Sequence, residues 1–159
     1  MIKQVNEENL AECADVIRKS FMTVADEFGF TAENAPRFTA FATTRDRLSR
    51  QLLEERRPMY AEFDGDSIVG YFSLSVQGGE CELNNLCVLP ECRHGGLGGE
   101  LLTSAFDAAK KLGCTRLNIG IVEENKTLRK WYEAYGFVHI GTKKFDFFPF
   151  TCGYMYKEL

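Results

Sequence analysis

Residues 88–102 read Val-Leu-Pro-Glu-Cys-Arg-His-Gly-Gly-Leu-Gly-Gly-Glu-Leu-Leu. An apolar segment runs into Pro90, four glycines surround Leu97, and an amphipathic pattern with helical spacing follows at once. Glycine lets the backbone approach a ligand and adopt positive φ, and a helix N-terminus presents unpaired N–H groups at the positive end of its dipole. The segment therefore predicts a loop that binds a phosphate or a diphosphate. Arg93, just before the glycines, can add a fixed positive charge.

Two common phosphate-binding loops do not fit this segment. A P-loop requires Gly-Lys-Ser/Thr at the start of the helix, and this chain has Gly98-Gly99-Glu100. A dinucleotide-binding loop requires G-x-G-x-x-G with an acidic residue ~20 residues later. From Gly96 the chain reads Gly-Leu-Gly-Gly-Glu-Leu, and position 118 is Asn. Both alternatives fail.

The pattern that does fit is Arg-x-x-Gly-x-Gly, from Arg93 to Gly98. It resembles the coenzyme A loop of the GNAT superfamily of acyl-CoA-dependent N-acyltransferases. Residues 125–137 read Asn-Lys-Thr-Leu-Arg-Lys-Trp-Tyr-Glu-Ala-Tyr-Gly-Phe, which is similar to that family's Asn…Tyr-x-x-x-Gly-Phe segment. The resemblance extends from Ile68 to the C-terminus. It implies a GNAT fold and an N-acetyltransferase that uses acetyl-CoA as co-substrate, without a metal.

Composition limits the class of protein. A chain of 159 residues with 45% hydrophobic content fits one domain, 1–159. A net charge of −4 argues against a nucleic-acid partner. We find no signal peptide and no apolar run near ~18 residues, so we expect no membrane association and a cytoplasmic location. The six cysteines form no C-x-x-C pair, so we expect no metal site and read them as packing residues. A reactive thiol at Cys87 or Cys92 is the alternative.

Hydrophobic periodicity predicts an α/β fold with the order β-α-α-β-β-β-α-β-α-β-β. We expect strands at 2–5, 59–63, 68–76, 80–89, 115–122, 138–148 and 153–159, and helices at 10–28, 45–55, 97–112 and 125–136. A helix separates strands 4 and 5 (80–89 and 115–122), which predicts that they lie parallel in a mixed, mostly antiparallel sheet. The resemblance implies that these two strands splay apart beside the thioester.

Glu82 is the candidate general base. An amine with a pKa near ~10 must lose a proton before or as it attacks a thioester, and a carboxylate can accept that proton directly or through water. The period of a strand puts Glu82 on the same face as Asn84, Leu86 and Val88. The resemblance assigns the family's frequent glutamate base to Glu82. The alternative is a solvated carboxylate near a strand end.

Tyr132 is the candidate general acid, because a phenol can give a proton to the departing thiolate. The resemblance matches it to the family's tyrosine. The alternative is a simple core stripe, since Leu128, Trp131, Tyr132 and Tyr135 recur at helical spacing. Asn125 can cap the helix that follows it, and the resemblance adds an amide contact to the pantetheine arm.

The expected cofactor contacts fall into two groups. Backbone N–H groups of the glycine loop bind the diphosphate, and the strand edge before Pro90 pairs with the pantetheine amides and polarises the thioester carbonyl. The residues concerned are Leu86, Cys87, Val88, Arg93, His94, Gly95, Gly96, Leu97, Gly98, Gly99 and Asn125.

The acceptor is expected to be a small-molecule or peptide amine, and the sequence leaves its identity open. Aromatic residues concentrate in the first helices and in 145–150, which predicts an aromatic pocket mouth with Phe28, Asn84 and Phe148 as substrate-binding candidates. Three further hypotheses stay open: a coenzyme A-binding regulatory module without catalysis, a longer acyl-CoA as donor, and a homodimer formed through the Phe-rich 145–150 segment.

Overall fold

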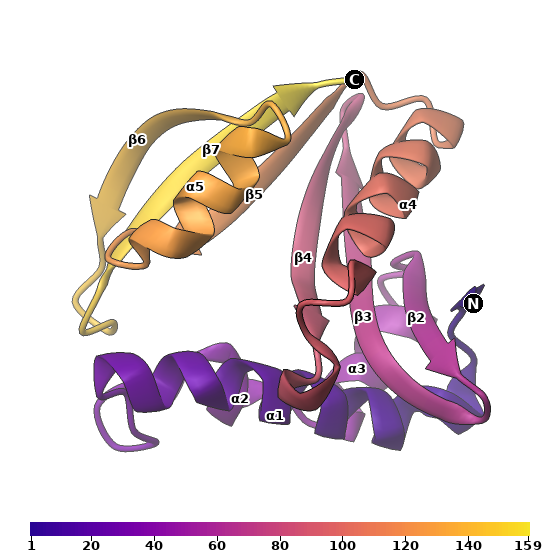
Figure 1. Cartoon of the computed structure of the whole chain (residues 1–159), viewed down its shortest axis with the longest axis horizontal. Helices are drawn as coiled ribbons and strands as arrows, with labels where there is room; N and C mark the ends of the chain where they lie inside the picture. Colours follow the sequence, from indigo (N-terminus) through magenta and orange to yellow (C-terminus); the bar gives the residue numbers. More distant parts are fainter.

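A seven-stranded sheet of order β1-β2-β3-β4-β5-β7-β6 forms the centre of the computed structural model, which describes residues 1–159 (Figure 1). Its strands are β1 Ile2–Gln4, β2 Met59–Asp64, β3 Ser67–Gln77, β4 Glu80–Val88, β5 Arg116–Val122, β6 Val138–Lys144 and β7 Thr151–Glu158. Only β4 and β5 pair in parallel. The predicted mixed, mostly antiparallel sheet is confirmed.

Five α-helices connect the strands. They are α1 Leu10–Phe28, α2 Thr39–Ala42, α3 Arg45–Leu53, α4 Leu97–Lys111 and α5 Lys126–Ala134. The predicted order of long elements is confirmed, and α2 is a single turn that the sequence analysis did not anticipate. The strand expected at 138–148 ends at Lys144, so the Phe-rich segment forms the connection between β6 and β7. No helix is both long and apolar enough to cross a membrane.

Helices cover both faces of the sheet. On one face, Leu10 and Ile17 of α1 and Leu48 of α3 share a buried cluster with Tyr71 of β3. On the other face, side chains of α4 and α5 pack with those of β3, β4 and β5, including Leu101, Leu102, Ala105, Tyr132, Phe72 and Leu117. The central strand β3 is consequently buried on both faces from Ile68 to Leu74.

Gly70 allows α4 to pack closely on β3. A Cβ at this position would lie 2.7 Å from Leu101 Cδ1 and 3.1 Å from the carbonyl oxygen of Cys87. This close approach holds the start of α4, and the loop before it, against the end of β4.

The sheet divides between β4 and β5. The two strands pair only at Glu80–Arg116, Cys81–Leu117 and Glu82–Asn118. Beyond Glu82 they separate, and α1 runs across the open end of the gap (Figure 1). The expected splay between strands 4 and 5 is therefore present.

A bulge in β4 overturns one expectation about which side chains share a face. The register against β3 shifts between Tyr71 and Ser73, and Asn85 adopts a positive φ of 55°. Cys81 and Leu83 before the bulge share a core with Val88 after it, whereas Cys87 packs toward α1. The predicted common face of Glu82, Asn84, Leu86 and Val88 is wrong, because the extra residue reverses the alternation.

Candidate active site

The glycine loop presents a row of unused N–H donors. His94 and Gly96 have positive φ angles of 67° and 87°, and Gly96 is the N-cap of α4. The six consecutive main-chain N–H groups from His94 to Gly99 donate no hydrogen bond to the backbone, and the first that does is that of Glu100, to Gly96 O at 3.1 Å. Unpaired donors at a helix N-terminus form an anion-binding site.

The Arg93 side chain is directed away from this row. Its Nε donates to Val88 O at 3.0 Å, Nη1 to Thr23 Oγ1 at 3.1 Å and Nη2 to Ser20 O at 2.9 Å. The guanidinium therefore ties the loop to α1 and to the end of β4. The expectation that it adds its charge to the phosphate site is not met in this arrangement, and a contact through the Arg93 backbone stays a prediction.

Helix α5 closes over the loop from the opposite half of the sheet. A Cβ at Gly98 would lie 3.4 Å from Cζ2 of Trp131, and a Cβ at Gly99 would overlap the Tyr135 hydroxyl. Position 99 therefore has no room for a side chain while the Tyr135 hydroxyl lies there, whereas a Cβ at position 98 would only touch the Trp131 ring. Trp131 also packs edge-on against Tyr132, with ring centroids 5.0 Å apart. Helix α5 thus connects the loop to the gap between β4 and β5.

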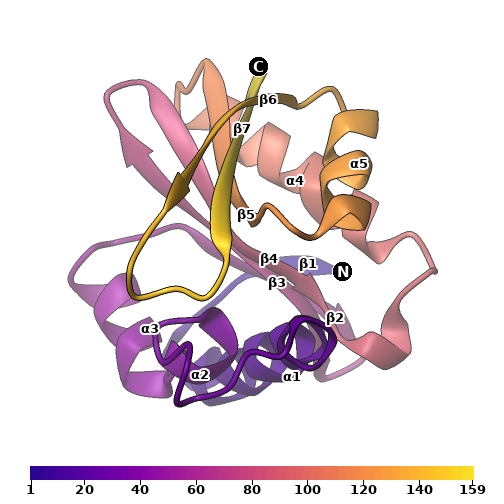
Figure 2. The same cartoon turned by 90° about the vertical axis from the view of Figure 1, so that its left-hand side faces the viewer.

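A cavity of about 240 Å³ occupies this gap. Leu86 of β4, Gly120 of β5 and Tyr132 of α5 line it, together with Asn125. Its other wall comes from α1, from the start of α2 and from the β6–β7 connection, which descends toward these helices (Figure 2). Fourteen of its 19 lining residues are hydrophobic, so the cavity suits a thioester and an apolar arm.

Tyr132 lies at the point where the cavity meets the core. Its side chain is buried, and this burial raises the pKa of the phenol above its ordinary value, with a smaller contribution from the nearby Cys87. The phenol is therefore fully protonated at neutral pH. A protonated hydroxyl beside the cavity can donate a hydrogen bond or a proton to a group inside it.

Glu82 lies exposed at the last residue pair before β4 and β5 separate, and it does not line the cavity. It is close to Tyr154, which does. Burial raises the pKa of the Tyr154 phenol, and the negative charges of Cys152 and Glu82 raise it further. The Glu82 carboxylate therefore lies outside the cavity wall, next to a tyrosine that lines it.

The other predicted contacts divide between the cavity and the surrounding structure. Asn125 is an N-cap, since its Oδ1 accepts a hydrogen bond from Leu128 N at 3.2 Å, and it also lines the cavity. Phe148 lines the cavity as well. Asn84 instead donates to Ser75 Oγ at 2.9 Å, and Phe28 stacks on Phe30 with centroids 6.0 Å apart. Neither Asn84 nor Phe28 lines the cavity.

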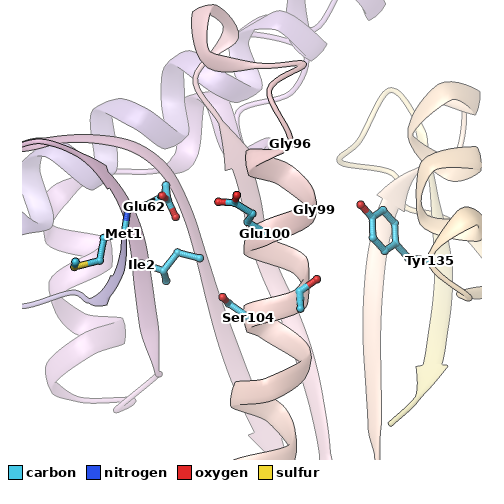
Figure 3. A pocket seen from close by; sticks show the side chains of 9 residues that line it. Met1, Ile2, Glu62, Gly96, Gly99, Glu100, Ser104 and Tyr135 are labelled. Atoms are coloured by element: carbon cyan, nitrogen blue, oxygen red, sulfur yellow. Dashed lines mark hydrogen bonds and ion pairs between the residues drawn. The ribbon is translucent and has the colours of Figure 1, made fainter.

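A second, wider hollow of about 680 Å³ runs along the first turns of α4. Glu100 and Ser104 point from α4 toward Glu62 of β2, and Tyr135 lies on the other side of the helix (Figure 3). The Glu62 carboxylate is paired with the Met1 ammonium at 2.7 Å. The side of α4 that faces β2 therefore carries one carboxylate without an ion pair, that of Glu100, whereas the side that faces α5 meets aromatic rings.

The model of the acetyltransferase (GNAT) family matches residues 21–137, which include the glycine loop, both splayed strands and α5. The chain belongs to the GNAT acetyltransferase family. GNAT enzymes are acyltransferases that act on amines, and the expected enzyme class is confirmed.

Individual GNAT relatives support the assignment. The chain is 27% identical to the thialysine N-ε-acetyltransferase of Bos taurus over 143 residues, which cover 86% of this chain and 82% of the relative. The PaiA N-acetyltransferase of Thermoplasma acidophilum, solved with coenzyme A, is 19% identical with a TM-score of 0.86 over 100% of this chain and 98% of the other. The ribosomal-protein-S18-alanine N-acetyltransferase of Escherichia coli is 16% identical with a TM-score of 0.78, over 99% and 92%. These two structures establish a shared fold.

Three polar lining residues of this GNAT cavity were not anticipated from the sequence. Asn85 reaches it because of the bulge, and the Asn84-Asn85 pair was its only sign, since Asn tolerates positive φ. Arg37 lies just before α2 and Thr39 is its first residue, and both line the cavity. No motif marks them, because α2 is too short for a periodic pattern.

Proposed function

We propose that the chain is one GNAT domain, residues 1–159, that transfers the acetyl group of acetyl-CoA to a primary amine by direct attack in a ternary complex. The main support for this proposal is that two binding features, the glycine loop and the cavity, both border α5. Six unpaired N–H groups lie beside Trp131, and an apolar cavity lies beside Tyr132. A diphosphate and a thioester are two parts of one coenzyme, and the structural relative PaiA was solved with coenzyme A.

The diphosphate binds the free N–H groups of residues 94–99 on the side of the loop that faces α5. The opposite side carries the Glu100 carboxylate, which would repel a doubly negative group. The fixed backbone donors and the helix dipole supply the positive potential, since the Arg93 guanidinium is already bonded to α1.

The pantetheine arm lies along the edge of β4 that β5 leaves unpaired, from Leu86 to Val88. Its amides pair with this edge and with the Asn125 side chain. A backbone N–H of the same edge binds the thioester carbonyl and then the oxyanion that develops from it. Such donors contribute ~2.7–4 kcal/mol of transition-state stabilisation in other acyl-transfer sites.

Proton transfer accompanies the attack. The amine nitrogen forms a bond to the acetyl carbon, and the bond from that carbon to sulfur breaks. Glu82 accepts the amine proton through a water molecule beside Tyr154, and Tyr132 gives its proton to the departing thiolate. Proton exchange with solvent then returns Glu82 to its carboxylate form and Tyr132 to its phenol form. The burial of Tyr132 keeps its phenol protonated until that step.

Thiol release from acetyl-CoA in the presence of a panel of primary amines tests the proposal. Glu82→Gln and Tyr132→Phe each lower turnover ~100-fold or more, while the calorimetric affinity for acetyl-CoA stays within about twofold of wild type. Glu80→Gln is the matched control for Glu82, because Glu80 lies on the same strand and forms only an ion pair with Arg116 at 3.2 Å. Tyr156→Phe is the control for Tyr132.

Two outcomes contradict the proposal in different ways. A protein that gives no binding heat with acetyl-CoA has no coenzyme site. A protein that binds coenzyme A tightly but releases no thiol with any amine is a binding module without catalysis.

A further inference from the structure

One end of the cavity is built from aromatic rings. They belong to α1, to the residue before α2 and to the β6–β7 connection, and they are Phe21, Phe38, Phe148 and Phe150. The rings support one another: Phe38 meets Phe150 edge-on at 5.8 Å between centroids, and Phe148 stacks on Phe150 at 4.5 Å. Such a rigid apolar wall fits the apolar body of an acceptor.

Arg37 is the only charged residue that lines the cavity. Arg37 is exposed, and its guanidinium carbon lies 4.1 Å from the centroid of the Phe147 ring, so a cation–π contact with the Phe-rich connection holds it at the rim that faces solvent. The ion pairs of the protein use other arginines, namely Arg18, Arg45, Arg57, Arg116 and Arg129. Arg37 is thus a cation without a counter-ion, in a protein with a net charge of −4.

No carboxylate lines the cavity beside Arg37. Glu82 acts only at the end where β4 and β5 separate, through Tyr154. An acceptor with one amino group therefore finds a base at that end. A second ammonium group at the aromatic end would lie near the positively charged Arg37 guanidinium, and no carboxylate there could pair with that ammonium group.

We infer that the acceptor is an apolar primary amine that carries an anionic group, such as a carboxylate, and that Arg37 binds that group. This inference rests on the proposed function. Arg37 supplies specificity rather than chemistry: it selects amino acids or aminocarboxylates over neutral amines, and it rejects diamines and polyamines. The planar guanidinium suits a carboxylate because it can bind both oxygens at once.

Three primary amines of equal chain length isolate the effect of the distant group: ε-aminocaproate, hexylamine and hexamethylenediamine. We expect wild-type kcat/KM to fall in that order, by about tenfold or more at each step. Arg37→Gln brings the first two within about threefold of each other, whereas Arg37→Lys retains part of the preference. Arg47→Gln, which removes an exposed arginine of α3 outside the cavity, leaves the wild-type ratios in place.

Amine affinity measured by calorimetry with coenzyme A bound gives a second readout, because no acetyl group can be transferred there. A wild type that does not prefer ε-aminocaproate in either measurement overturns the inference, and so does a preference that survives Arg37→Gln. If the affinity order holds but no amine releases thiol from acetyl-CoA, the inference stands and the proposed chemistry fails.

Discussion

Arg93 Nη2 donates a hydrogen bond to the carbonyl oxygen of Ser20 at 2.9 Å, and this bond connects the glycine loop to the middle of α1. The same guanidinium also donates hydrogen bonds to Thr23 Oγ1 and to the carbonyl oxygen of Val88. Three bonds from one planar group fix the loop relative to the cavity wall before any ligand binds. We therefore infer that the Arg93 side chain, which was expected to add its charge to the phosphate site, positions the loop instead.

Replacement of Arg93 by Met should loosen the loop and lower the affinity for acetyl-CoA. Hydrogen bonds from a charged group are worth ~1.5–3 kcal/mol, so we expect a loss of about that size in the free energy of unfolding. We also expect the dissociation constant of acetyl-CoA to rise at least about tenfold, because the N–H groups are no longer preorganised. Urea unfolding and calorimetry measure the two quantities.

Arg18→Met is the control for this variant. Arg18 also joins α1 to another segment, since its Nη1 donates to Thr43 O at 3.0 Å, but it does not touch the loop. It should lower stability and leave the coenzyme affinity unchanged. Equal affinities for the two variants would contradict the positioning role of Arg93.

A Cβ at Gly96 should weaken coenzyme binding more than it weakens the fold. Gly96 has a φ of 87° at the N-terminus of α4, and Gly113 has a φ of 81° just beyond the C-terminus of the same helix. Neither site has an atom within 4 Å of an added Cβ, so backbone strain of ~1–2 kcal/mol is the shared cost of Gly96→Ala and Gly113→Ala. Only Gly96→Ala should lose affinity for acetyl-CoA, by about tenfold, since the methyl group is added within the row of unpaired N–H donors. Equal loss in both variants would mean that strain alone is responsible.

The sequence predicted the parts of the site that depend on local chemistry. Gly96 and Gly98 predicted the loop because clustered glycines directly before a helix are typical of an anion-binding loop. Asn125 predicted the start of α5 because asparagine is a preferred N-cap residue. The parallel pairing of β4 with β5 followed from the helix between them.

The parts that depend on tertiary context were not predictable in this way. The bulge at Asn85 reverses the faces of β4, and strict alternation cannot reveal one extra residue. The direction of the Arg93 side chain depends on the Thr23 hydroxyl and the Ser20 carbonyl of α1, which lie 70 and 73 residues away in sequence. Arg37 belongs to no motif, because it lies in the connection between α1 and α2, which has no periodic pattern.

Cys87 should not behave as a reactive thiol, although it lies next to the expected thioester. Burial raises its pKa to about 12, against a smaller opposing effect of the Arg93 charge, and the thiolate is the nucleophilic form. Native protein treated with iodoacetamide near pH ~8 should be modified only at the half-buried Cys92 and Cys152, whereas all six cysteines react in urea. Mass spectrometry of peptides distinguishes the sites, and native modification of Cys87 would contradict its burial.

Stability should fall as the pH rises above 9, because the protein buries thiols that an unfolded chain would ionise. Burial raises the pKa of Cys13 from 9.0 to about 12, with smaller contributions from Cys87 and Glu12. Between these two values the folded state keeps a proton that the unfolded state has lost. The contribution of Cys13 is therefore fully present below pH 9 and is lost as the pH rises toward 12, by up to ~1.4 kcal/mol per pH unit.

Cys13→Ala should therefore make the unfolding free energy decline less steeply between pH 9 and pH 11. The change in slope should correspond to about one proton fewer released on unfolding, whatever the effect of the substitution on stability at neutral pH. Val16→Ala is the matched control, since Val16 is buried in the same cluster of α1 and carries no titratable group. It should lower the whole curve and keep the wild-type slope. Urea unfolding at several pH values gives both slopes, and identical slopes for Cys13→Ala and Val16→Ala would mean that Cys13 titrates alike in the folded and unfolded states.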